Sequence, residues 1–333
     1  MSIHAYAAAG PGKPLEPFSF EPGPLGPHEI EIGITHCGIC HSDIHMIDND
    51  WGWSSYPLVP GHEVVGIVRE AGAEVRRLSA GQRVGVGWQS GSCLECEWCL
   101  SGRENCCARQ QGTIVGRHGG FADALRVDER FAFPLPEAIE SSLAGPLLCG
   151  GVTVYSPLRE DARPWFRVGV VGIGGLGHLA IQFARAFGCE VTAFSTSAGK
   201  RAEALELGAH EFVVSTDAGR MKAAAGSLDL LLSATTARLD WQAWVGLLRP
   251  RGILTIVGAS PGALDVEAGA ILTGQKTVRG SLIGGRARLA EMLDFAARSG
   301  VRPRVEVVPM REVNPAIAKV RQNRARYRMV LEA

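Results

Sequence analysis

The chain has 333 residues, more than one ordinary hydrophobic core holds, and this length predicts two domains. Lysine plus arginine equals aspartate plus glutamate at 34 each, so the net charge does not favour nucleic acid or an acidic membrane as a partner. No apolar run reaches the roughly 18 to 20 residues that span a bilayer, and residues 1–18 lack the basic-then-apolar pattern of a signal peptide. We therefore expect a cytoplasmic protein that binds neither membrane nor nucleic acid.

Residues 1–36 predict short strands joined by turns, because β-type runs such as 29–35 alternate with Pro and Gly breaks. Residues 64–72 and 82–88 continue this pattern, with each β-branched run cut by glycine. Together these segments predict an all-β or mostly β lobe.

Residues 37–66 include at least seven side chains that can bind a metal ion or carry a proton. They include Cys37, Cys40, His41, Asp43, His45, His62 and Glu63. One cysteine or one histidine would be an ordinary core or surface residue. Seven such groups in thirty residues favour a metal such as Zn²⁺, which takes thiolate and imidazole ligands. The stretch alone does not say which of them are ligands.

Residues 93–107 carry the most specific pattern, C-x2-C-x2-C-x7-C, formed by Cys93, Cys96, Cys99 and Cys107. Cysteines at this spacing converge on one tetrahedral zinc, and four thiolates leave no position for a substrate. We predict a structural zinc lobe over about residues 90–110. Cys106 competes with Cys107 as the fourth ligand. Compartment and net charge disfavour the alternatives, a disulfide cluster and a zinc ribbon that binds nucleic acid.

A second domain begins near residue 144, where the pattern becomes helical over 141–158 and then gives a strand, a tight turn and a helix over 167–188. The turn carries G-x-G-x-x-G, in the strand-to-helix context that indicates dinucleotide binding. Its glycines allow a tight turn, a close approach to pyrophosphate and close helix packing, while the helix N-terminus holds the anion. The cofactor contacts predicted here are Gly172, Gly174, Gly175, Leu176 and Gly177.

The end of the next predicted strand, 189–197, indicates which dinucleotide binds. An acidic residue at this position would accept hydrogen bonds from the adenosine ribose of NAD, but Ser195 stands there. The hydroxyls and cations that follow suit a 2′-phosphate, which a carboxylate would repel. These residues are Thr196, Ser197, Lys200 and Arg201. The alternative is that the two cations form the solvated face of the next helix. We predict NADP(H).

Strands and helices continue to alternate to the end of the chain, which predicts an α/β domain with a doubly wound parallel sheet. The predicted strands are 211–215, 229–234, 252–259 and 276–284. A helix over 286–300, a strand over 301–310 and a last helix and strand should pack back on the first lobe.

Taken together, these motifs resemble the medium-chain zinc-dependent alcohol dehydrogenases, and within them the cinnamyl-alcohol-dehydrogenase-like, NADPH-dependent aldehyde reductases. The matching motifs are GICHSD, PGHEVVG, PLLCGGVTVYSPL, GIGGLGH, AFSTS and ARYRMVL, together with the four-cysteine lobe. The resemblance runs end to end. It implies a GroES-like, mostly β catalytic domain over 1–143 and 285–333, and a Rossmann domain that binds NADP(H) over 144–284.

The resemblance also implies two zinc ions per chain, one structural and one catalytic. The ligands that it gives for the catalytic zinc are Cys40, His62 and Cys149. A set of two cysteines and one histidine leaves one position open, as catalysis requires. Glu63 resembles a carboxylate that enters the zinc shell transiently, and Asp43 resembles the group that orients the His62 ring. Cys37 is then a buried thiol with no assigned role.

Proton transfer is assigned by the same resemblance. Ser42 matches the hydroxyl that exchanges a proton with the substrate alkoxide, and His45 matches the outer end of the relay. Histidine titrates near neutral pH and suits that place, although a plain surface histidine is the alternative. His41 matches the position facing the pyrophosphate, and Thr153 the one that touches the nicotinamide.

Further cofactor contacts are expected at Val257, Ser281 and Ile283. The candidates for the substrate wall are Trp51, Trp88, Leu282 and Ile283. Each of these could instead belong to the core.

The sequence departs from the family at Gly81-Gln82-Arg83-Val84, where the family usually has Gly-Asp-Arg-Val. Because that aspartate is structural, we expect a change in local packing and none in the chemistry.

The expected activity is reversible hydride transfer, run as reduction of aromatic and medium-chain aldehydes by a homodimer. The alternatives are an NAD-linked oxidation of alcohols or polyols and a non-catalytic zinc protein that senses NADPH. The open site argues against the second, because a structural metal needs no vacant position.

Overall fold

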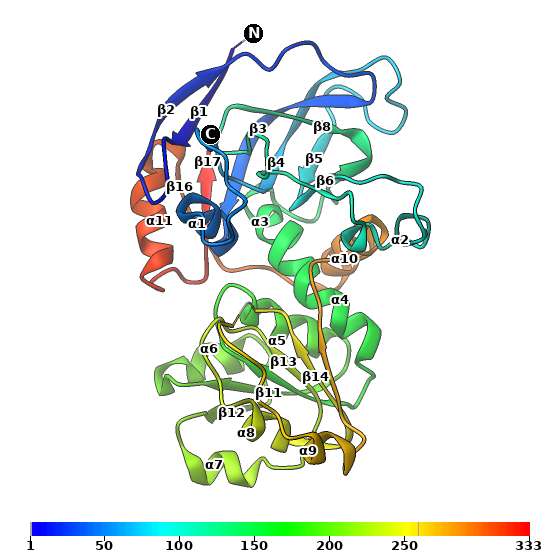
Figure 1. Ribbon diagram of the computed structural model, residues 1–333, viewed down its shortest axis with the longest axis vertical. Coiled ribbons are helices and arrows are strands. Elements are labelled where there is room, and N and C mark those ends of the chain that lie inside the picture. Colours follow the sequence, from blue (N-terminus) through cyan, green and yellow to red (C-terminus); the bar gives the residue numbers. More distant parts are fainter. Residues whose placement is uncertain (1, 259) are drawn as a thin grey trace. The chain divides into compact units, whose positions relative to one another are not determined.

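The computed structural model describes residues 2–258 and 260–333, which form two compact units (Figure 1). The first unit comprises Met1–Val152, Gly284–Arg298 and Arg302–Ala333, and the second comprises Thr153–Ile283 with Ser299–Val301. Residue 259, the last residue of one predicted strand, lies outside the described residues.

The first unit is built on a seven-stranded sheet with the order β16-β17-β3-β4-β5-β9, in which β8 also pairs with β3. Its strands are β3 (Glu29–Ile39), β4 (Glu63–Ala71), β5 (Arg83–Val86), β8 (Ala124–Asp128), β9 (Ala132–Pro134), β16 (Val305–Pro309) and β17 (Arg328–Glu332). Two small sheets accompany it, formed by β1 (Ile3–Ala8) with β2 (Leu15–Phe20) and by β6 (Gln89–Gly91) with β7 (Gln111–Gly112). The mostly β domain expected from the sequence is confirmed.

The register of this sheet brings three distant parts of the chain to one place. β3 runs antiparallel to β4, with Gly38 opposite Glu63, and also antiparallel to β17, with Met329 opposite Ile39. The end of β3, the start of β4 and the start of β17 are therefore adjacent. Cys40, Glu63 and Arg328 follow or begin these strands.

Helix α1 (His41–Asp48) departs from the all-β pattern expected for this part of the chain. It begins after Cys40, which forms a capping box with Asp43. Its apolar face buries Ile44, Met46 and Ile47. The helical period is hard to read because candidate metal ligands and proton carriers occupy the positions between these apolar residues.

The helical pattern predicted over 141–158 is confirmed as α3 (Ser141–Pro146), a π-helical turn (Leu147–Gly151) and α4 (Val152–Asp161). Pro146 has no N–H to donate, which disturbs the regular ladder at the point where the turn widens. Such π turns are frequent at functional sites. Here the turn contains Cys149.

The second unit contains a parallel sheet with the order β12-β11-β10-β13-β14-β15, the doubly wound arrangement expected from the sequence. Its strands are β10 (Arg167–Val171), β11 (Glu190–Ser195), β12 (Glu211–Val214), β13 (Leu228–Ser233), β14 (Leu248–Ile256) and β15 (Thr277–Gly280). Its helices are α5 (Gly177–Ala186), α6 (Arg201–Glu206), α7 (Ala218–Ala223), α8 (Trp241–Gly246) and α9 (Ala268–Leu272). The central strands β10 and β13 are almost wholly buried, as strands covered on both faces are.

The chain then returns to the first unit through α10 (Arg286–Ser299), β16, α11 (Val313–Arg321) and β17. The predicted helix, strand, helix and strand are all present, and β17 joins the first sheet beside β3. Within the described part of the chain, no helix combines the length and the apolar character needed to cross a membrane.

The turn before β5 accommodates the departure at Gln82. The Oε1 atom of Gln82 accepts a hydrogen bond from the backbone N–H of Ser79 at 3.3 Å. Gly81 has φ of 86°, in the left-handed region that glycine tolerates. Arg83 donates to the carbonyls of Pro136 and Ile139. The glutamine side chain thus closes this turn.

Candidate active site and metal centres

Four side chains of the first unit meet at one point, with one ligand atom of each within 4.8 Å of the others. They are Cys40, His62, Glu63 and Cys149. The Sγ atoms of Cys40 and Cys149 are 4.0 Å apart, and Nε2 of His62 is 3.2 Å from Sγ of Cys149. Such a group could hold a metal ion.

Asp43 connects two members of this group. Its Oδ2 accepts a hydrogen bond from the backbone N–H of Cys40 at 2.8 Å. Its Oδ1 accepts from the N–H of Gly61 at 2.9 Å and lies 2.8 Å from Nδ1 of His62. Because Nδ1 faces a carboxylate, Nε2 of His62 is left to face the two cysteines. Both Asp43 and His62 are fully buried.

The two cysteines share a negative charge even without a metal. A hydrogen bond with Cys149 lowers the pKa of Cys40 well below the ordinary thiol range, and His62 lowers it further. The same interaction, together with burial, raises the pKa of Cys149. A thiolate is the form of cysteine that binds metal.

Glu63 is buried and forms a short ion pair with Arg328, the first residue of β17. Burial raises the pKa of Glu63 to about 7, although Arg328 opposes the rise. The second carboxylate oxygen, Oε2, is buried and has no hydrogen-bond partner among the described residues. The Glu63 side chain has a carboxylate oxygen within 4.8 Å of the ligand atoms of Cys40, His62 and Cys149. An orphaned buried carboxylate oxygen beside thiolates suits a cation that the site would hold.

Arg328 was not among the residues assigned from sequence, although it lies in the quoted motif ARYRMVL. The signal that could have found it is an arginine within a terminal apolar strand, because a buried cation needs a buried anion. Its guanidinium faces Glu63 and both thiols, and these anions raise its pKa against the effect of burial.

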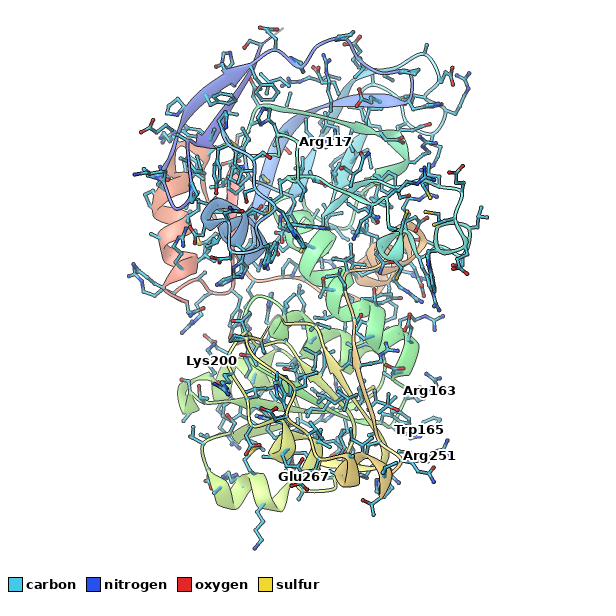
Figure 2. All side chains as sticks on the ribbon, viewed as in Figure 1. Arg117, Arg163, Trp165, Lys200, Arg251 and Glu267 are labelled. Atoms are coloured by element: carbon cyan, nitrogen blue, oxygen red, sulfur yellow. The ribbon has the colours of Figure 1, made fainter. Side chains whose placement is uncertain are left out.

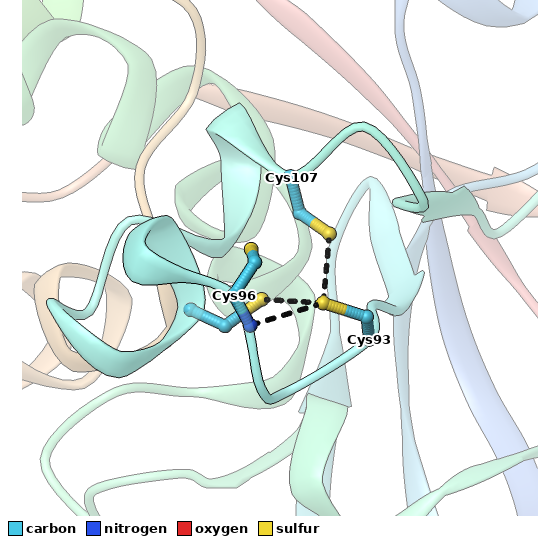
Figure 3. Close-up of side chains that lie close together, drawn as sticks. Cys93, Cys96 and Cys107 are labelled. Atoms are coloured by element: carbon cyan, nitrogen blue, oxygen red, sulfur yellow. Dashed lines mark hydrogen bonds between the residues drawn. The ribbon is translucent and has the colours of Figure 1, made fainter.

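The four cysteines predicted for the structural zinc also lie together. Figure 3 labels three of them, Cys93, Cys96 and Cys107. Sγ of Cys93 is 3.5 Å from Sγ of Cys107 and 3.8 Å from Sγ of Cys99, and it accepts from the N–H of Cys96 at 3.4 Å. A backbone hydrogen bond from Glu95 lowers the pKa of Cys93 to about 6.

Four thiol sulfurs around one point match the donor set of a closed zinc site. Cys106 is exposed and lies outside this group of four. Cys37 belongs to neither metal group. Its thiol is buried against the carbonyl of Gly38, and burial raises its pKa.

The predicted proton path begins beside Cys40. The Cys40 thiol lies 3.8 Å from Oγ of Ser42, at the start of α1. His45, one turn further along this helix, is partly exposed, and its Nδ1 lies 2.7 Å from a carboxylate oxygen of Asp50. His41 is exposed at the first position of the helix, with its ring 6.5 Å from that of His45.

Three tryptophans form a continuous row that starts at His62. The ring of Trp88 packs edge-on at 5.0 Å from the imidazole, Trp51 lies 6.0 Å from Trp88, and Trp53 lies 5.3 Å from Trp51. The row ends at the surface, where Trp53 is 57% exposed. Trp53 was not among the predicted wall residues, although its two-residue spacing from Trp51 could have signalled a shared aromatic surface.

The predicted dinucleotide turn lies between β10 and α5 in the second unit. Gly172 has φ of 86°, and a Cβ at Gly177 would lie 1.7 Å from the Gly172 carbonyl oxygen, so both positions require glycine. A Cβ at Gly174 would meet no atom of the described residues within 4 Å, so it would point into open space among them. Gly175 and Leu176 lead into α5, whose N-cap is Leu176.

Ser195 ends β11, and its Oγ accepts a hydrogen bond from the N–H of Ser197 at 3.2 Å. Thr196 and Ser197 are exposed. Lys200 is labelled in Figure 2. Its ammonium donates to the carbonyl of Ile173 in the glycine turn. The structure thus brings Lys200 to the turn.

Arg201 instead donates to the carbonyl of Phe212, at the next strand, with an N–O distance of 3.4 Å. The remaining predicted cofactor residues are also placed within the second unit. Thr153 is buried in α4. Val257 and Ser281 follow β14 and β15, and their N–H groups donate to Ser233 and Ile256.

Ile283 is buried with φ of 42°, and Leu282 is exposed.

Comparison with known proteins shows the family to which the chain belongs. Residues 26–137 match the alcohol dehydrogenase GroES-like domain, and residues 175–298 match the zinc-binding dehydrogenase domain. The chain belongs to the zinc-dependent alcohol dehydrogenase family. It is 47% identical over 330 residues to aldehyde reductase AdhA of Synechocystis sp., covering 99% of this chain and 98% of that protein.

Two solved structures of this family are similar along the whole chain. A cinnamyl alcohol dehydrogenase of Sorghum bicolor has a TM-score of 0.96 at 44% identity, covering 100% of this chain and 98% of that one. A cinnamyl alcohol dehydrogenase of Helicobacter pylori, complexed with NADP(H), has a TM-score of 0.92 at 30% identity, with the same coverage.

Replacing Arg328 by leucine should leave the buried Glu63 carboxylate without its cation. Breaking one side of a buried ion pair costs about 3–5 kcal/mol, so we expect the free energy of unfolding to fall by that order. The measurement is denaturant unfolding of the zinc-loaded protein. Arg311→Leu, at an exposed arginine, should change it by less than about 0.5 kcal/mol.

Adding Glu63→Gln to Arg328→Leu should recover part of the loss, because the orphaned charge is then removed. Equal stability of Arg328→Leu and the unmodified protein would contradict the electrostatic account of this pair.

Proposed function

We propose that this protein reduces aldehydes to primary alcohols, reversibly, by zinc-assisted hydride transfer from NADPH. The observation that carries the proposal is the donor set of Cys40, His62 and Cys149. This set brings together three thiol or imidazole groups, whereas the four-cysteine lobe brings together four thiols. Three such ligands leave a position for a substrate oxygen.

When bound, the zinc supplies a Lewis acid for the carbonyl oxygen, and NADPH supplies the hydride. The chain supplies position and proton transfer. Asp43 keeps His62 turned toward the thiolates through the bond to Nδ1. Ser42, beside Cys40, would pass a proton to the developing alcohol, and His45 would renew it from solvent.

Glu63 would enter the zinc shell transiently while ligands exchange. Its unpartnered Oε2 supports this role, because that oxygen gives up no hydrogen bond within the described residues when it turns to a cation. Arg328 keeps the other oxygen occupied.

The choice of NADPH over NADH follows from the end of β11. Ser195 brings no negative charge there, Thr196 and Ser197 offer exposed hydroxyls, and Lys200 and Arg201 follow. The similar Helicobacter pylori enzyme, solved with NADP(H), supports the same choice. The pyrophosphate would lie at the glycine turn.

The tryptophan row indicates the class of aldehyde. Trp88 and Trp51 extend from His62, and we now add Trp53 as the outer member of that wall. Aromatic rings stack in offset or edge-on pairs and offer little to a polar polyol. We therefore propose aromatic and medium-chain aldehydes, with Leu282 and Ile283 as further wall residues.

We also propose that the enzyme works in the cytoplasm as a homodimer joined through the sheet of its nucleotide-binding domain. Within the described residues β15 is the last strand of that sheet, and its outer edge is available for pairing. Leu264 and Leu272 are exposed in the segments around it. The domain limits that we propose are 1–143 with 285–333, and 144–284.

Initial rates with an aromatic aldehyde should show a strong preference for NADPH over NADH. Ser195→Asp should weaken NADPH binding at least about tenfold, or roughly 1.4 kcal/mol, because the new carboxylate repels the 2′-phosphate. NADH binding should change much less. Ser79→Asp is the matched control, because it adds the same charge at an exposed serine of the first unit.

The assignment of NADPH would be contradicted if the unmodified protein preferred NADH. It would also be contradicted if Ser195→Asp changed the binding of NADPH and of NADH equally. An NAD-linked oxidation of alcohols or polyols would then be the better account.

Metal analysis should find two zinc ions per chain. Cys149→Ala should bind one and lose turnover, because only the open site is affected. Cys106→Ala should keep both ions and full activity, because its exposed thiol lies outside both groups. Turnover by Cys149→Ala would refute the assignment of the catalytic ligands and would leave room for a non-catalytic NADPH-binding protein.

A further inference from the structure

Glu104 is a buried acid that none of the roles above uses. It begins the 3₁₀ turn η1 (Glu104–Cys106), inside the four-cysteine lobe, and it is only 2% exposed. A buried carboxylate is costly unless it is paired and hydrogen bonded. Its partner is Arg286, the first residue of α10, which lies far away in the sequence.

The contact is made to both the backbone and the side chain of Arg286. Oε2 of Glu104 accepts from the backbone N–H of Arg286 at 3.0 Å, and Oε1 accepts from its Nε at 2.8 Å. The first N–H groups of a helix have no partner within the helix, and a negative charge near them is favourable. Glu104 therefore acts as an N-terminal cap of α10 that comes from another part of the chain.

The chain passes this point in direct contact with the lobe. A Cβ added at Gly285 would lie 2.1 Å from the carbonyl oxygen of Gly102 and 2.6 Å from Oε2 of Glu104. No side chain fits there, so glycine allows the backbone before α10 to rest against the lobe. Gly102 in turn ends the turn that follows Cys99, to whose carbonyl its N–H donates.

The position of Glu104 depends on hydrogen bonds from Cys107 and Gln89 to its backbone carbonyl. Its carbonyl accepts from the N–H of Cys107 at 3.0 Å and from Nε2 of Gln89 at 2.8 Å. Cys107 is one of the four candidate ligands, with its sulfur 3.5 Å from that of Cys93. A metal held by these sulfurs would fix η1, and η1 carries the carboxylate.

We infer that the four-cysteine lobe serves as the anchor of residues 284–287, and that its metal and Glu104 together hold the start of α10 in place. Glu104 is a positioning residue. The anchored segment is where the chain returns to the first unit, and it follows directly on Leu282 and Ile283. An effect on substrate or cofactor binding rests on the proposed function, whereas the anchoring does not.

Hydrogen exchange of the zinc-loaded protein tests the anchoring. Glu104→Ala should make the amides at the start of α10 exchange roughly 3- to 30-fold faster, the effect of losing a helix cap. Glu104→Gln keeps one acceptor and should give a smaller change. Glu97→Gln, at an exposed acid of the same lobe, should leave these amides unchanged.

Cys96→Ser should lower the zinc content from two ions to one and accelerate the same amides. Unchanged exchange at the start of α10 in Glu104→Ala would overturn the cap. Unchanged exchange in Cys96→Ser, after loss of one zinc, would overturn the dependence on the metal.

Steady-state rates separate this result from the proposed function. If residues 282 and 283 line the site, Glu104→Ala should raise KM for the aldehyde or for NADPH severalfold while kcat changes less than about twofold. Faster exchange with an unchanged KM would support the anchor and would count against those two wall residues. Slower exchange or no change would count against the anchor alone, whatever the activity.

Discussion

Three hydrogen bonds converge on the buried carboxylate of Asp43, and the geometry of the candidate active site depends on them. They come from the N–H groups of Cys40 and Gly61 and from the ring of His62. The same carboxylate closes the capping box that starts α1. The Asp43 side chain thus fixes where α1 begins, where the Cys40 thiol points and which ring nitrogen of His62 faces that thiol. A metal site on such a frame is organised before any ion binds.

The second constraint is charge. With a metal bound, two thiolates and an ionised Glu63 would put three negative charges in a buried place, and a divalent ion would balance only two of them. Arg328 supplies the remaining positive charge from β17, the last strand of the first sheet. The charges of the site are therefore balanced only when the C-terminal strand β17 is in place. That requirement gives a physical reason why the two ends of the first unit share one sheet.

Much of this arrangement could be predicted from the sequence. Spacing predicted the four-cysteine lobe, and the alternation of strands and helices predicted the doubly wound sheet, because these features are local. The set of Cys40, His62 and Cys149 was different, because local spacing left seven candidates and only the family resemblance selected among them. Helix α1 was missed because polar functional residues interrupt its apolar period. Arg328 and the contact of Glu104 with α10 were missed because both depend on pairing between distant segments, which no short pattern encodes.

The central claim is that the chain holds one open and one closed zinc site, and X-ray absorption at the zinc edge tests it most directly. Six cysteines shared by two ions predict an average of about three sulfur neighbours per zinc, near 2.3 Å, with nitrogen or oxygen completing the shell. In the Cys149→Ala protein the average should rise toward four, because only the closed site keeps its metal. An average of four sulfurs in the unmodified protein would leave no open position and would contradict the account.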